Sequence, residues 1–93
     1  MESYDKQEFT QAKKYFKKAC DLQYAEGCTR LGISYYNGEG VKGGLIKAIQ
    51  YYKKACDLNN GFGCRGLSFL YENGYGVEED QEKAAQYYEK RGV

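Results

Sequence analysis

The chain repeats itself with a period of 36 residues, and this feature constrains its fold more than any other. The block Tyr15–Leu22 returns as Tyr51–Leu58, and a third, partial copy follows from Lys83. The same interval relates Cys20, Cys28 and Gly38–Val41 to Cys56, Cys64 and Gly74–Val77. A fixed period of this length is typical of a stacked array, in which each unit buries its apolar face on its neighbour. Such an array offers a surface, so we expect binding rather than catalysis.

Within each period, apolar residues step by three and four, which indicates amphipathic helices. We predict three outer helices and two shorter inner helices, and hence an all-α domain of about five helices over residues 1–93. Asn-Gly pairs should end the inner helices, because glycine readily adopts the left-handed conformation found there. The expected outer helices are 8–22, 44–58 and 80–91, and the expected inner helices are 26–37 and 62–73.

Composition excludes several classes of function. The 93 residues contain no histidine, so no Ser-His-Asp triad, Cys-His pair or His-ligated zinc site is possible. The net charge of +1 predicts no general affinity for nucleic acid, and no apolar run approaches a membrane span of roughly 20 residues. The polar start also lacks a secretory signal, so an exported protein would be represented by its mature form or a fragment. We predict no metal and no cofactor.

Several motifs resemble known repeat families. Leu31-Gly32-x-x-Tyr35, followed by Ala48-x-x-x-Tyr52, resembles the tetratricopeptide pattern stretched to 36 residues. The Gly-x-Gly-Val loops with a downstream Lys-Ala are similar to Sel1-like repeats. The added Lys-Ala-Cys-Asp-Leu and Gly-Cys elements are similar to the Helicobacter cysteine-rich protein family. This resemblance implies a right-handed α/α superhelix with one disulfide per repeat, in a secreted or periplasmic protein.

The cysteines suggest two covalent links. Cys20 and Cys56 end outer helices, whereas Cys28 and Cys64 begin the inner helices that follow. A hairpin of antiparallel helices brings such positions close together, so we predict the pairs Cys20–Cys28 and Cys56–Cys64. Free buried thiols are one alternative. A metal site is another, although Cys-x₇-Cys does not match the short spacing that zinc prefers. Disulfides would require an oxidising compartment.

In tetratricopeptide-type arrays the inner helices line a concave groove, and the resemblance assigns groove positions here. The set mixes apolar side chains with Arg and Asn, which suits recognition of a protein or peptide. Arg65 is the position expected to bind a carboxylate. The alternative is that Ile33 and Phe69 are inter-repeat core and the arginines are merely solvated. The predicted groove residues are Glu26, Thr29, Arg30, Ile33, Tyr36, Asn37, Phe62, Arg65, Phe69, Glu72 and Asn73.

Two further functions stay open. Some members of the resembled family bind β-lactams and hydrolyse them slowly, and Ser3-Tyr4-Asp5-Lys6 matches the Ser-x-x-Lys motif of penicillin-interacting enzymes. The other motifs of those enzymes are missing, so we assign no catalytic residue and attribute any such binding to a groove that accepts a β-lactam or a cell-wall peptide. The last possibility is an isolated or engineered repeat fragment with no ligand. Uncovered terminal helices also make self-association plausible.

Overall fold

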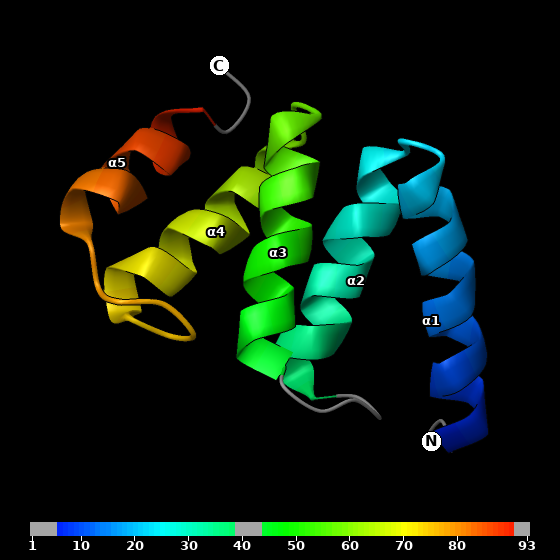
Figure 1. Ribbon diagram of the computed structural model, residues 1–93. Coiled ribbons are helices and arrows are strands. Elements are labelled where there is room, and N and C mark those ends of the chain that lie inside the picture. The colour runs from blue at the N-terminus through cyan, green and yellow to red at the C-terminus, as the bar shows by residue number, and fades with distance from the viewer. Residues whose placement is uncertain (1–5, 39–43, 91–93) are drawn as a thin grey trace, which may run out of the picture.

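The computed structural model describes residues 6–38 and 44–90, and within them the side chains from Gln11 onward. This part of the chain is helical and contains no strand. The helices lie side by side in chain order, with α1 at one end of the array and α5 at the other (Figure 1). They are α1 (Lys6–Asp21), α2 (Ala25–Asn37), α3 (Gly44–Asp57), α4 (Gly61–Asn73) and α5 (Gln81–Glu89).

Local signals explain where these helices begin and end. Gly38 and Gly74 follow the inner helices with φ angles of 70° and 68°, as the Asn-Gly pairs predicted. Asp80 accepts a hydrogen bond from the backbone N–H of Lys83 at 2.9 Å and so caps α5. The helix bounds agree with the expected ones to within two residues, and the end of α2, the start of α3 and the end of α4 match them. Helix α5 ends at Glu89, and residue 91, its expected last residue, lies outside the described part.

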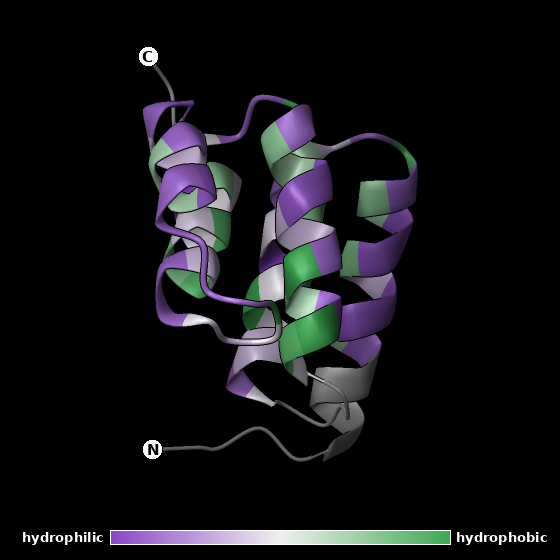
Figure 2. Ribbon diagram, turned by 60° about the vertical axis from the view of Figure 1, so that its left-hand side comes forward, coloured by the Kyte–Doolittle hydropathy of each residue, from purple (hydrophilic) through white to green (hydrophobic). Residues whose placement is uncertain are grey.

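The helices form a right-handed α/α superhelix with two layers. Each helix packs on the next one along the chain, and the inner helix α2 also contacts the inner helix α4. The outer helices α1, α3 and α5 make up the other layer. Hydrophilic residues run along both terminal helices (Figure 2). None of the described helices is long and apolar enough to cross a membrane.

A disulfide joins the two helices of each hairpin. Cys20 is bonded to Cys28 and Cys56 to Cys64, with Cα atoms 4.6 and 4.5 Å apart. All four residues are buried, and each pair belongs to a separate apolar cluster. The predicted pairing is therefore confirmed, and the free-thiol and metal alternatives are wrong for these cysteines. The bridges lie inside the core, where they hold each outer helix against its inner helix.

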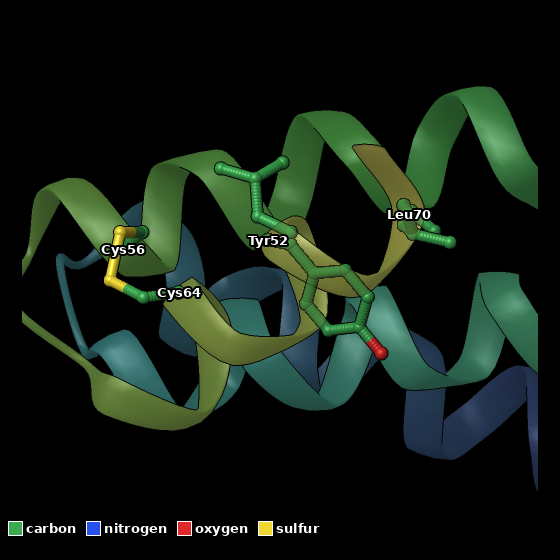
Figure 3. Packing of buried hydrophobic residues seen from close by; sticks show 6 residues of the cluster. Tyr52, Cys56, Cys64 and Leu70 are labelled. Atoms are coloured by element: carbon green, nitrogen blue, oxygen red, sulfur yellow. A yellow bond between two sulfur atoms is a disulfide. The ribbon is translucent and has the colours of Figure 1, made fainter. Parts of the chain in front are cut away.

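Tyr52 on α3 is the aromatic centre of the array. Its side chain is 7% exposed and packs between two glycines of the inner helices, Gly32 and Gly66. A Cβ atom at Gly32 would lie 2.7 Å from the ring, so only glycine leaves room for it. Figure 3 shows this ring in the same apolar cluster as the Cys56–Cys64 bridge and Leu70, between the two. Burial raises the pKa of the Tyr52 hydroxyl to about 12, which keeps the side chain neutral.

A second aromatic contact repeats with the 36-residue period. Tyr35 stacks on Tyr51 with ring centroids 5.6 Å apart, and Tyr71 stacks on Tyr87 at the same distance. A lysine from the next outer helix lies over the first ring of each pair, 5.8 Å away for Lys47 and 5.4 Å away for its repeat counterpart on α5. The repeat therefore carries its own inter-helix contact, which explains part of its tyrosine content.

Candidate functional site

The predicted groove residues lie on α2 and α4, and many of them line two adjoining surface hollows between these helices. The hollows have volumes of about 410 and 400 Å³. We call this region the α2/α4 surface. The first hollow is lined by Thr29, Ile33, Tyr52, Phe62, Arg65, Gly66 and Phe69. The second is lined by Glu26, Thr29, Arg30, Ile33, Asn60 and Phe62.

Large apolar side chains on this surface are exposed. Ile33 is 42% exposed, Phe69 44% and Phe62 70%. Ile33 and Phe69 are thus exposed to solvent rather than enclosed between the repeats, in contrast to the alternative that places them in the core. Apolar side chains at helical spacing are usually buried, so three exposed ones around one hollow are a distinctive feature of this surface.

The two arginines of this surface differ in their surroundings. The Arg30 guanidinium donates to the Glu26 carboxylate at 3.2 Å and also lies over the Phe16 ring. Arg65 has no acidic partner among the described residues. Gly61 and Phe62 stand four and three residues before Arg65, so its own helix offers no acidic side chain at these positions. Arg65 is thus a cation on the wall of a hollow whose neighbours are largely apolar.

Four other predicted groove residues either have structural roles or lie away from the two hollows. Thr29 is 6% exposed, and its hydroxyl donates to the side-chain oxygen of Asn60 at 3.0 Å, which ties α2 to the start of α4. Asn73 donates from its side chain to the Phe69 carbonyl at 2.9 Å at the end of α4. Glu72 lines a different hollow, between α4 and α5. Asn37 lines neither hollow of the α2/α4 surface.

Four residues in or next to this surface were not predicted, and one of them, Gly66, lines the first hollow. Tyr75, in the loop after α4, is 42% exposed and its ring meets Phe69 edge-on, with centroids 5.9 Å apart. Tyr52 and Asn60 line the hollows from below. Asn60 also caps α4 by accepting from the Gly63 N–H at 2.9 Å. The Asn60-x-x-Gly63 spacing is a capping signal that sequence reasoning could have used. Tyr36, which was predicted, joins the surface through an edge-on contact with Phe69.

The described residues offer little for catalysis. They contain no group of three or more His, Cys, Asp or Glu side chains able to hold a metal ion. The hydroxyl of Ser68 is buried and donates to the Ala84 carbonyl at 2.7 Å, so it serves packing. Ser3 and the rest of the Ser-x-x-Lys motif up to residue 5 lie outside the described residues.

Comparison with known families agrees with this architecture. The model of the Sel1 repeat matches residues 4–24, 25–60 and 62–90, which together span most of the chain. The chain belongs to the Sel1 repeat family. The middle match corresponds to one full period, from α2 through α3, so a Sel1 repeat in this chain pairs an inner helix with the outer helix that follows.

Curated relatives of this chain come from Helicobacter pylori. The putative β-lactamase HcpC is 60% identical over 45 residues, which cover 48% of this chain and 16% of that protein. The β-lactamase HcpA is 54% identical over 49 residues, which cover 53% of this chain and 20% of that protein. The chain thus matches about a fifth or less of the length of these curated Sel1-type relatives.

Two solved Sel1-type structures share the fold. Helicobacter pylori cysteine rich protein B superposes with a TM-score of 0.81 and 43% identity, over 85% of this chain and 59% of that chain. A Sel1 repeat protein from Oxalobacter formigenes superposes with a TM-score of 0.79 and 25% identity, over 85% of this chain and 32% of that chain. These likenesses support the five-helix superhelix described above.

Proposed function

We propose that this protein is a non-enzymatic recognition module that binds a protein or peptide through the α2/α4 surface. Sel1 repeats are typically protein-interaction scaffolds, and this chain has two inner helices that present exposed apolar side chains around hollows of peptide-contacting size. A surface with apolar anchors and a few charged groups suits binding of side chains together with a charged end.

Arg65 is the observation that supports this proposal most strongly. It borders a hollow with Ile33 and Phe69, and no carboxylate among the described residues neutralises it. A guanidinium binds a carboxylate through two parallel hydrogen bonds, and a partly apolar wall strengthens that pairing by reducing solvation. We therefore assign Arg65 the binding of a peptide carboxylate, either the C-terminus or an acidic side chain.

The change Arg65→Gln tests the proposal. We expect it to reduce the binding free energy of a carboxylate-bearing ligand by roughly 1.5–3 kcal/mol, because a charged hydrogen bond is lost. The immobilised protein is exposed to random octapeptides that end in a free carboxylate, and to the same pool as C-terminal amides. Retained peptides are identified by mass spectrometry, and their affinities are measured by calorimetry.

Arg30→Gln is the matched control, because Arg30 is already paired with Glu26 and should matter little. Both variants change an exposed arginine, so folding is preserved. If the amidated pool is retained equally well, or if Arg65→Gln retains the same peptides with the same affinity, the carboxylate assignment is wrong. If neither pool is retained, the chain is a repeat scaffold without a peptide ligand.

The disulfides support an oxidising compartment, and we propose a secreted or periplasmic location on that basis. Reducing cytosol keeps most protein thiols free, whereas such bridges persist in the periplasm and outside the cell.

Binding of a β-lactam is a second candidate, favoured by the names of the relatives HcpA and HcpC. A penicillin carries a carboxylate beside an apolar ring system, which matches the chemistry around Arg65 and Phe69. Competition between benzylpenicillin and a retained peptide tests this candidate, and nitrocefin turnover tests whether binding leads to hydrolysis.

A further inference from the structure

Three aromatic rings gather at the far end of the α2/α4 surface. Phe69 on α4 lies at the centre, Tyr36 on α2 meets it edge-on at a centroid distance of 6.1 Å, and Tyr75 meets it edge-on at 5.9 Å. All three are exposed by about two fifths, with values of 44%, 38% and 42%. The cluster joins two repeats and a loop, and it presents ring faces and edges to solvent.

The Tyr75 ring belongs to a loop that is held in place. Gly74 and Gly76 on either side of it have φ angles of 68° and 80°, which only glycine adopts readily. The Tyr75 N–H donates to the Leu70 carbonyl at 2.9 Å, and the Asp80 N–H donates to the Tyr71 carbonyl at 3.0 Å. The loop is therefore tied to the end of α4 on both sides, and little ordering is needed when a ligand binds.

We propose that Tyr36, Phe69 and Tyr75 form a second subsite of the same surface. It takes apolar side chains of an extended peptide whose C-terminal carboxylate pairs with Arg65. This inference rests on the proposed function and specifies its ligand. An aromatic cluster alone would accept many apolar molecules, but the cation beside it selects one that is also anionic.

The spacing of these groups fits an extended chain. Arg65 and Phe69 are four residues apart on α4, which is about 6 Å along the helix axis. The Tyr75 ring is the next aromatic group, with its centroid 5.9 Å from that of the Phe69 ring. In an extended peptide, side chains on one face recur every two residues, or roughly 6.6 Å. The ligand should thus carry apolar rings two and four residues before its C-terminal residue.

The probe is the fluorescein-labelled peptide Gly-Ser-Phe-Ser-Phe-Ser-Ala with a free carboxylate, and binding is followed by fluorescence anisotropy. Its matched control, Gly-Ser-Ser-Phe-Ser-Phe-Ala, has the same composition but places the rings one and three residues before the end. We expect the first peptide to bind at least fivefold more tightly. In the control peptide each phenylalanine lies one residue nearer the C-terminus, so its rings face the opposite side of the extended chain.

Tyr75→Ala should lower the affinity for the first peptide roughly three- to tenfold, which corresponds to the usual energy of an aromatic contact. The same variant should not change the affinity of Gly-Ser-Ser-Ser-Phe-Ser-Ala, which lacks the outer ring. Tyr15→Ala serves as the matched control, because Tyr15 is 76% exposed on α1 and away from the cluster. Thermal unfolding of both variants should remain cooperative, with a small loss of stability for Tyr75→Ala because its ring also contacts Phe69.

The subsite is overturned if the first peptide does not bind, if the two isomers bind equally, or if Tyr75→Ala binds the first peptide as the unchanged protein does. An equal loss for the peptide lacking the outer ring also overturns it, because the effect would not depend on the contact. None of these results touches the carboxylate assignment, which is decided by the random pools and Arg65→Gln.

Discussion

Removing both disulfides should lower the free energy of unfolding by about 5 kcal/mol, which is enough to unfold much of the protein at 37 °C. Each bridge joins two cysteines that are eight residues apart in the sequence. In the chain-entropy model, closing such a loop stabilises the folded protein by roughly 2.5 kcal/mol. The total is comparable to the whole stability of a small domain. The variant replaces all four cysteines by alanine, and urea unfolding followed by circular dichroism measures the loss.

The two pairs provide controls for each other. Cys20→Ala with Cys28→Ala should cost about half of the total, and so should the second pair, because each bridge lies in its own apolar cluster. Reduction of the unchanged protein should reproduce the effect of the quadruple variant. A quadruple variant that unfolds at the same urea concentration as the unchanged protein would show that the helices hold together without the bridges.

Tyr52→Ala should destabilise the protein by about 3–5 kcal/mol, the usual cost of removing a large buried aromatic side chain. The ring fills the space between Gly32 and Gly66, and neither glycine can supply side-chain atoms to replace it. Removal of the ring would therefore weaken the packing of α3 on both inner helices, α2 and α4. Thermal and urea unfolding of the oxidised protein measure this effect with the bridges intact.

Tyr88→Ala is the matched control for this experiment, because Tyr88 is the counterpart of Tyr52 one period later. Its side chain is 50% exposed, so its removal should cost less than about 1 kcal/mol. If the two substitutions cost the same, burial between the glycines is not what makes Tyr52 important. The residue type and its place in the repeat are the same in both, whereas their exposure differs.

The repeat made the architecture predictable. The period, the glycines after the inner helices and Asp80 before α5 are local signals, and the structure has helices at these places. The cysteine pairing was also accessible, because a helical hairpin limits which cysteines can meet. These features depend on short stretches of chain and on contacts between neighbouring units, which the internal repetition displays directly.

The surface was less predictable because it depends on which side chains the packing leaves exposed. Ile33 and Phe69 have the helical spacing of core residues, and only the arrangement of α2 beside α4 shows that they face solvent. Thr29 shows the opposite outcome, because it was predicted to face the groove but is buried. Its hydroxyl is hydrogen-bonded to Asn60 at the start of α4. Tyr75 lies in a loop, where no periodic pattern indicates the direction of a side chain.

The difference between Arg30 and Arg65 also needed the structure. Glu26 lies four residues before Arg30, so their ion pair could be inferred from helical spacing. The absence of an acidic partner for Arg65 among the described residues depends on every helix around it. The repeat alignment does not relate the two arginines, because Arg65 is the counterpart of Thr29 and Arg30 is the counterpart of Gly66.

The central claim is that the α2/α4 surface binds a peptide carboxylate through Arg65, and side-chain NMR tests it most directly. The ¹⁵N-labelled, oxidised protein is titrated with a peptide retained from the carboxylate pool, while the Arg65 Nε–H resonance is followed. We predict a saturable shift of that resonance, together with backbone shifts at Ile33 and around Phe69, and no comparable shift with the amidated peptide. Shifts confined to the outer helices, or an Arg65 resonance that stays in place as the peptide saturates the protein, would contradict the account.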